Sequence, residues 1–135
     1  MTRRTTRASR PADGAVVPNP PAYSPKLLWR VAFGVAIAVQ LIAVYAPVGP
    51  GGPEVTGLDK VVHILIFFAP ALAALMMGLR ARWALGILAL HAPVSELVQH
   101  VALPQRDGDL FDVMADLTGV VLGGLAYMVW KRRHP

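Results

Sequence analysis

Four apolar segments of about 20 residues each constrain the fold of this chain more than any other feature. They run roughly from Leu27 to Ala46, Leu58 to Leu79, Trp83 to Leu103 and Leu110 to Trp130. An α-helix needs about 20 residues to cross the hydrocarbon core of a bilayer, which is about 30 Å thick. The connections PVGPGGPEVTG, RAR and PQRDGD are rich in proline, glycine or charge, as turns and loops are. The sequence therefore predicts an all-α fold, an integral membrane four-helix bundle.

Composition supports a single membrane domain with a basic extension at each end. Of the 135 residues, 55% are hydrophobic and only 16% are charged, so the chain is more apolar than a typical soluble protein. We expect residues 1–25 to be a disordered basic cytoplasmic tail, 26–131 the four-span membrane domain and 132–135 a short basic tail. The absence of cysteine excludes disulfides and thiolate metal sites.

The distribution of lysine and arginine predicts the orientation of the spans. With four spans, only Lys60 and Arg106 of the 13 basic residues fall on one side, and the other 11 fall on the opposite side. Basic residues gather on the cytoplasmic side, so both termini are predicted to be cytoplasmic and the protein to lie in the plasma (inner) membrane. The net charge of +5 then reflects topology, and we expect membrane lipids rather than nucleic acid as partners.

The first apolar segment has one competing interpretation, a signal peptide cleaved after Ala46. The basic lead of 26 residues is long for a signal peptide, and Pro47 follows the proposed cleavage position directly. We therefore predict an uncleaved first span.

The acidic residues concentrate on the side that lacks basic residues, where several share helix faces. Seven of the eight acidic residues, all except Asp13, belong to this outer half. Residues at spacings of three, four and seven lie on one face of a helix. Such sets are Asp59 with His63, Glu96 with Gln99 and His100, and Asp109 with Asp112 and Asp116. Because ionisable groups facing lipid are costly, we expect these stripes to face one another around an outer polar pocket.

The members of these stripes carry different predictions. Glu96 and Asp112 lie next to lipid-type sequence and are predicted to form a packed polar site with His63. A buried acid at Asp116 is expected to be neutral or paired. Arg106 either clamps one of these carboxylates or holds an anionic envelope ligand. We expect Asp59 and Lys60 either to mark the membrane interface or to join the pocket. We expect Asp107 and Asp109 to be solvated loop charges.

The histidines could bind a metal ion or haem, but no sequence motif specific for either is present. His63 and His100 are expected at similar depth, where a metal ion could bind them with Glu96 or Asp112. Paired histidines also hold haem in some membrane bundles. We predict neither a metal nor another cofactor, and we expect His91, which lies deeper, to be a hydrogen-bonded core residue.

Gly119 and Gly123 form a G-x-x-x-G pattern in the last span. Such a pattern lets a neighbouring helix approach closely, and by itself it does not imply a dimer.

Three blocks in this order resemble the VanZ-like family of small multi-pass membrane proteins. The first is Asp59-Lys60-x-x-His63 with Phe67 and Phe68, and the second is Ser95-Glu96-x-x-Gln99. The third comprises Arg106, Asp112, Gly119 and Gly123, so the resemblance covers roughly residues 58–124. The chain departs from the family pattern at Asp116, where the family usually has asparagine. The resemblance implies a role, known for some members, in tolerance of lipid-tailed glycopeptides such as teicoplanin, and it implies no particular reaction.

Three functions are compatible with these features. The first is a membrane accessory protein whose outer pocket binds an envelope lipid or peptidoglycan-precursor component. The second is a membrane-embedded hydrolase that uses Glu96, Asp112 and His63 or His100, with or without a metal. The third is an ion or proton pathway, which would need ionisable groups through the whole membrane, whereas the inner half has none. We rank the three in this order and leave open whether the protein is an enzyme.

Overall fold

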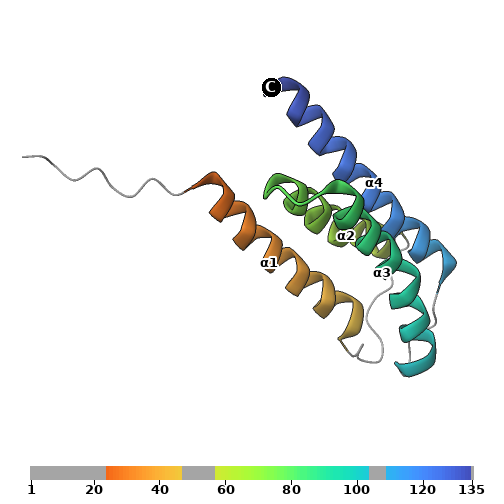
Figure 1. Ribbon diagram of the computed structural model, residues 1–135. Helices are drawn as coiled ribbons and strands as arrows, with labels where there is room; N and C mark the ends of the chain where they lie inside the picture. The colour runs from red at the N-terminus through yellow and green to blue at the C-terminus, as the bar shows by residue number, and fades with distance from the viewer. Residues whose placement is uncertain (1–23, 47–56, 104–108, 135) are drawn as a thin grey trace, which may run out of the picture.

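The computed structural model describes residues 24–46, 57–103 and 109–134, and the regular structure there is entirely α-helical. The helices are α1 (Pro25–Tyr45), α2 (Leu58–Met76), α3 (Ala81–Ala102) and α4 (Leu110–Arg133). Figure 1 shows the start of α1 and the end of α4 at the same end of the assembly. The all-α prediction is confirmed, and each of the four apolar segments forms one helix.

The short connection between α2 and α3 requires a glycine. Gly78 has φ 99°, in the left-handed region that only glycine adopts without strain. Its N–H donates to the carbonyl of Leu75, and the N–H of Leu79 donates to the carbonyl of Ala74, both at 3.0 Å. These two bonds form a Schellman motif, which satisfies the last carbonyls of α2 and reverses the chain into α3.

Helix α2 packs most extensively on α4 and next on α1, while α3 packs mainly on α4. The contact between α2 and α4 is close enough to need glycine. A Cβ at Gly119 would collide with the backbone carbonyl of Ile64. A Cβ at Gly123 would lie 2.9 Å from the backbone oxygen of Phe68. The G-x-x-x-G pattern of α4 therefore serves packing within one chain.

All four helices contribute to the main apolar core, so α1 belongs to the same assembly as the rest. The buried residues of this core are Val44, Phe67, Ala71, Leu88, Ala92 and Val120. A second cluster of Ala74, Leu75 and Ala84 lies nearer the α2–α3 turn. Alanine predominates in the second cluster, which is typical of helices that pack closely in a membrane.

The outer surface is largely apolar, as lipid contact requires. Three helices, α1, α2 and α4, are long and apolar enough to cross a membrane, which indicates a membrane protein. Helix α3 has 22 residues and carries Ser95, Glu96 and Gln99 among its apolar residues. All three of these side chains are buried.

Apart from the exposed Arg82 and His100, the exposed face of α3 is apolar. The side chains on it, spaced three or four residues apart, are Trp83, Ile87, Leu90, Val94, Leu97 and Val101. At 1.5 Å per residue this stripe extends about 27 Å, close to the thickness of a bilayer core. The mean hydropathy of α3 is lowered by polar residues that face the other helices, so it does not describe the apolar surface that α3 exposes.

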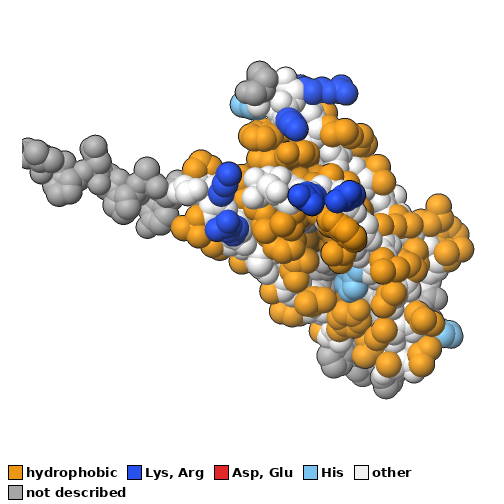
Figure 2. Space-filling view, viewed as in Figure 1, with side chains coloured by type: hydrophobic (Ala, Val, Ile, Leu, Met, Phe, Trp, Pro, Cys, Tyr) orange, Lys and Arg blue, Asp and Glu red, His pale blue; other side chains and the backbone are white. Residues whose placement is uncertain are grey.

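Exposed basic side chains gather at the end where α1 starts and α4 finishes. Figure 2 shows the lysine and arginine side chains of this face at that end and no acidic side chain. Helix α4 continues through Arg133, so Lys131, Arg132 and Arg133 form its last turn. Residues 132 and 133, which the sequence analysis assigned to a tail, are thus helical, and their positive charges interact favourably with the helix C-terminus.

Replacement of Gly119 by alanine tests the contact between α2 and α4. We expect Gly119→Ala to lower the free energy of unfolding by about 1–3 kcal/mol, because the new Cβ meets backbone that cannot rotate away. The matched control is Gly86→Ala in α3, where a Cβ meets nothing within 4 Å. Alanine is the better helix former by up to about 1 kcal/mol, so the control should be neutral or stabilising. Thermal unfolding of the purified protein in detergent measures both, and equal effects would refute the close contact.

Candidate functional site

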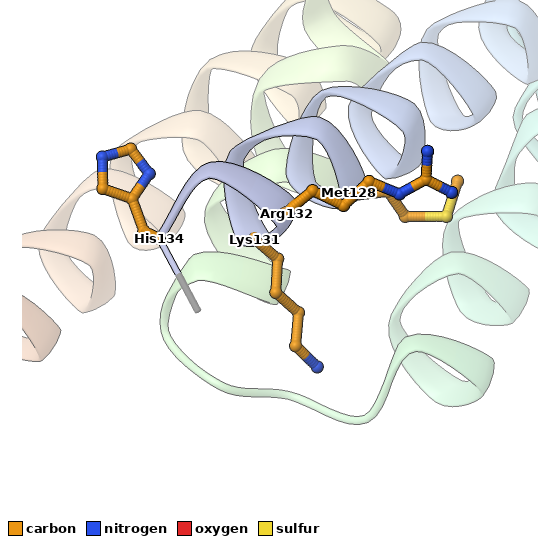
Figure 3. A pocket seen from close by; sticks show the side chains of 4 residues that line it. All are labelled: Met128, Lys131, Arg132 and His134. Carbon is orange, nitrogen blue, oxygen red and sulfur yellow. The ribbon is translucent and has the colours of Figure 1, made fainter.

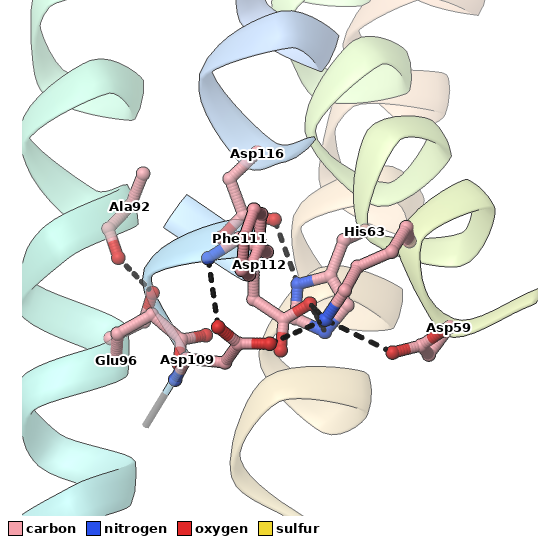
Figure 4. Close-up of polar contacts among 10 residues, drawn as sticks. Asp59, His63, Ala92, Glu96, Asp109, Phe111, Asp112 and Asp116 are labelled. Atoms are coloured by element: carbon pink, nitrogen blue, oxygen red, sulfur yellow. Dashed lines mark hydrogen bonds and ion pairs between the residues drawn. The ribbon is translucent and has the colours of Figure 1, made fainter. Parts of the chain in front are cut away.

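Ionisable side chains from α2, α3 and α4 meet at the end of the assembly opposite to the exposed basic residues. Figure 4 shows Asp59, His63, Glu96, Asp109, Asp112 and Asp116 converging there. We call these residues, together with Lys60, the polar cluster. In each of the three helices the polar residues lie in the turns nearest this end. They share one face of the helix, as their spacing of three or four residues predicts.

Lys60 on α2 is the central cation of the cluster. Its Nζ lies 2.5 Å from Asp112 Oδ1, 2.9 Å from Asp109 Oδ2 and 3.1 Å from Asp59 Oδ2. The Asp112 side chain is only 16% exposed, whereas that of Asp59 is 57% exposed. The Lys60–Asp112 pair is therefore shielded from water and binds α2 to α4, while the Lys60–Asp59 pair contributes little.

Asp109 connects the start of α4 to both neighbouring helices. Its Oδ1 accepts a hydrogen bond from the backbone N–H of Phe111, so it is the N-cap of α4. Its own backbone N–H donates to Glu96 Oε2 on α3 at 3.0 Å. The hydrogen bond from Lys60 lowers the pKa of the Asp109 carboxyl below its ordinary value. Because the pKa is lower in the folded than in the unfolded protein, the interaction stabilises the fold at pH values above the unfolded pKa. This stabilisation is lost as the pH falls through the pKa of the folded protein.

His63 and Asp116 form the buried part of the cluster. Nδ1 of His63 is hydrogen-bonded to Oδ1 of Asp116 at 2.9 Å, and Asp116 is fully buried. Nε2 of the same ring faces Asp112 Oδ1 at 4.0 Å. A buried acid in this position is thus paired, as the sequence analysis expected.

Two carboxylate oxygens in the cluster have no hydrogen-bond partner among the described residues. They are Oε1 of Glu96, whose residue is 5% exposed, and Oδ2 of Asp116. Most buried polar atoms in proteins are hydrogen-bonded, so such exceptions need an explanation. The adjacent Ser95 does not supply the missing donor, because its hydroxyl donates to the carbonyl of Ala92 at 2.8 Å.

The cluster also contains one group of residues with the chemistry and spacing of metal ligands. One ligand atom each from His63, Glu96 and Asp116 lie within 4.8 Å of one another. The metal alternative from the sequence had paired His63 with His100, but His100 is exposed. The structure thus replaces the second histidine with a second carboxylate.

The structure brings most of the predicted site residues together. Asp59, Lys60, His63, Glu96, Asp112 and Asp116 are all in the cluster, and Gln99 is buried on the inner face of α3. Arg106 and Asp107 lie outside the described residues. Asp109, expected to be a solvated loop charge, is instead an N-cap and an ion-pair partner, because its carboxylate reaches Lys60 from the start of α4.

Deeper polar residues accompany the cluster. His91 is hydrogen-bonded to the Tyr45 hydroxyl at 3.0 Å and stacks on Phe67, which confirms its prediction as a core histidine. Sequence reasoning missed Gln40 on α1, which is 1% exposed and whose side-chain amide has no partner among the described residues. A single amide in the middle of an otherwise apolar span was the available signal.

A separate hollow of about 400 Å³ lies at the basic end. Figure 3 shows its lining by Met128, Lys131, Arg132 and His134. All four residues are exposed, and His134 is bound to its own helix through the Trp130 carbonyl. This hollow is an open surface that carries two basic side chains, Lys131 and Arg132.

A double-mutant cycle tests the central ion pair. We expect Lys60→Met to lower the free energy of unfolding by about 1–3 kcal/mol, because Asp112 loses its charged donor in a shielded position. The coupling energy between Lys60→Met and Asp112→Asn should be about 1–2 kcal/mol. The control cycle with Asp59→Asn should give less than about 1 kcal/mol, because that pair is exposed. Equal coupling in both cycles, measured by unfolding in detergent, would contradict the central role of Asp112.

In comparisons with known proteins, no family model matches this chain, and no curated protein or solved structure gives a significant match.

Proposed function

We propose that the chain is a VanZ-like, four-span protein of the plasma (inner) membrane with both termini in the cytoplasm. Its polar cluster would then lie at the extracytoplasmic face and bind or modify an envelope lipid or a peptidoglycan-precursor component. The observation that supports this proposal most is the presence of unpartnered oxygens on Glu96 and Asp116, inside a cluster built by three helices. Keeping such groups costs folding free energy, and a ligand that donates hydrogen bonds would offset the cost.

The four-span arrangement draws support from α3. Its exposed apolar stripe from Trp83 to Val101 is long enough to cross the bilayer core, and Ser95, Glu96 and Gln99 are buried against the other helices. The basic residues at one end of the bundle would be cytoplasmic by the positive-inside rule. This orientation places Lys60 and the carboxylates on the outer side.

The chemistry of the cluster favours a polar head that donates hydrogen bonds. Five carboxylates and one lysine face this end among the described residues, so hydroxyl or ammonium groups suit it best. An anionic part of a ligand would have to lie near Lys60 or near Arg106, which is outside the described residues. A shallow apolar hollow of about 310 Å³ lies on the exposed face of α4, turned away from the buried Asp116, and is lined by Met114, Leu117, Thr118, Val121 and Leu122.

Glycopeptide tolerance follows from such an activity. The resemblance to the VanZ-like family implies tolerance of lipid-tailed glycopeptides, which we expect to meet the protein at the outer face of the membrane. A protein that binds or alters an envelope amphiphile there would change how much antibiotic accumulates at its target.

One observation favours a second candidate, a membrane-embedded hydrolase. The buried Asp116 orients His63 through a 2.9 Å hydrogen bond, and Glu96 lies nearby. A histidine that is oriented by a carboxylate is a common general base, so this arrangement can activate water or a hydroxyl group. A lipid that accumulates in cells lacking the protein would distinguish hydrolysis from binding.

Cysteine labelling tests the orientation, and the natural absence of cysteine leaves no background. Single cysteines at Gly52 and Gly108, which lie outside the described residues, should react with a membrane-impermeant reagent in intact cells. Cysteines at Ala81 and His134 should react only after the membrane is permeabilised. Labelling of Ala81→Cys from outside would refute the topology, and a mature protein shortened to begin after Ala46 would refute an uncleaved first span.

Survival on a lipoglycopeptide tests the function. In cells that lack the natural protein, Glu96→Gln and Asp112→Asn should reduce tolerance to the level of the empty vector, because each removes a carboxylate of the cluster. His100→Gln is the matched control, since His100 is exposed on the same helix near the same end. Membrane levels are compared by immunoblot. Full tolerance with both cluster variants would exclude the cluster as the working site.

A further inference from the structure

We propose that His63, Glu96 and Asp116 bind one divalent cation, with Mn²⁺ or Zn²⁺ as the best-suited ions. The three residues come from α2, α3 and α4, and Figure 4 shows their side chains projecting into the same space between these helices. One ligand atom from each lies within 4.8 Å of the others. The proposal goes beyond the proposed function, because the ion would take the two unpartnered oxygens itself, and an envelope ligand would then bind at the open coordination position of the ion.

The unpartnered oxygens are the observation that points to a ligand here. Glu96 uses Oε2 to accept the N–H of Asp109 and leaves Oε1 without a partner among the described residues. Asp116 uses Oδ1 for His63 and leaves Oδ2 likewise without a partner. Both residues are more than nine-tenths buried. A cation that both oxygens coordinate would satisfy the two orphan acceptors with a single ion.

The charge balance leads to the same conclusion. Asp59, Asp109 and Asp112 all surround Lys60, which is the only lysine or arginine at this end among the described residues. The positive charge of Lys60 is therefore already shared among three carboxylates. Glu96 and Asp116 remain, and among the described residues no lysine or arginine pairs with either of them. His63 is bonded to Asp116 and would be neutral as a metal ligand. Buried carboxylates without a counter-charge are costly, so a divalent ion fits the two negative charges that remain.

The ligand set indicates the class of metal. One imidazole with two carboxylates suits borderline and hard divalent ions of the first transition row, whereas the absence of sulfur ligands disfavours Cu⁺. Three protein ligands leave a coordination position for water or an oxygen atom of a ligand, as in catalytic rather than structural metal sites. The backbone N–H of Asp109 supports the site from outside by fixing Glu96.

Metal binding by the purified full-length protein tests the proposal. The protein is purified in detergent with an affinity tag that contains no histidine, and a chelator removes any bound metal. It is then titrated with Mn²⁺, and electron paramagnetic resonance measures how much Mn²⁺ is bound. We expect one bound Mn²⁺ per chain, displaceable by Zn²⁺. His63→Gln, Glu96→Gln and Asp116→Asn should each weaken binding by more than about 100-fold, because the loss of an outer-shell partner alone costs about 10–100-fold. The matched control His100→Gln should bind like the wild type.

Several outcomes would overturn the site. Wild-type protein that binds no more Mn²⁺ or Zn²⁺ than the Glu96→Gln/Asp116→Asn double variant would refute the site. An equal loss with His100→Gln would place the ion elsewhere. X-ray absorption of the Zn²⁺-loaded wild type needs no variant to fold, and it should show oxygen and nitrogen ligands with a single imidazole. Two imidazoles, or none, would overturn the assignment. Tolerance of lipoglycopeptides is measured separately in cells, so a failure of the metal site and a failure of the proposed function can be told apart.

Discussion

The backbone contact of α2 with α4 at Gly119 is the constraint on which the polar cluster depends. Gly119 lies against Ile64, the residue that follows His63. Asp116 is three residues before Gly119, so the same close approach brings its carboxylate to the His63 ring. Asp112, one turn further, reaches Lys60 for the same reason. A larger residue at position 119 would therefore separate both pairs as well as the two backbones.

Helix α3 completes the cluster from the other side and has two contrasting faces. Its exposed stripe is apolar throughout, while Ser95, Glu96 and Gln99 are buried against the other helices. Glu96 is also bound to the N-cap of α4 through the Asp109 N–H. The position of the carboxylate is therefore set by a backbone hydrogen bond, which is stiffer than a contact between two long side chains.

Much of the fold and most of the cluster could be predicted from sequence, because both follow from helical periodicity. The four helices begin and end within a few residues of the apolar segments, and the polar stripes on three of them do meet. Which charged side chains pair with each other was harder to predict, because it depends on the position of α4 relative to α2 along their length. For that reason Lys60 was not expected as the central cation, nor Asp109 as a member of the cluster. Gln40 was missed because its neighbours in sequence are all apolar, and only packing shows that it faces inward.

The polar groups end well before the opposite side of the bundle. His91 and Tyr45 are the deepest hydrogen-bonded pair described, and beyond them Ala74, Leu75 and Ala84 pack with Phe33, Leu85 and Tyr127. This apolar layer is an electrical insulator. In the proposed orientation most of the membrane potential, worth about 2.3 kcal/mol per charge at 100 mV for a full crossing, would fall across it. An ion or headgroup that enters the cluster from outside would cross little of the field, so its occupancy should depend only weakly on how energised the cell is.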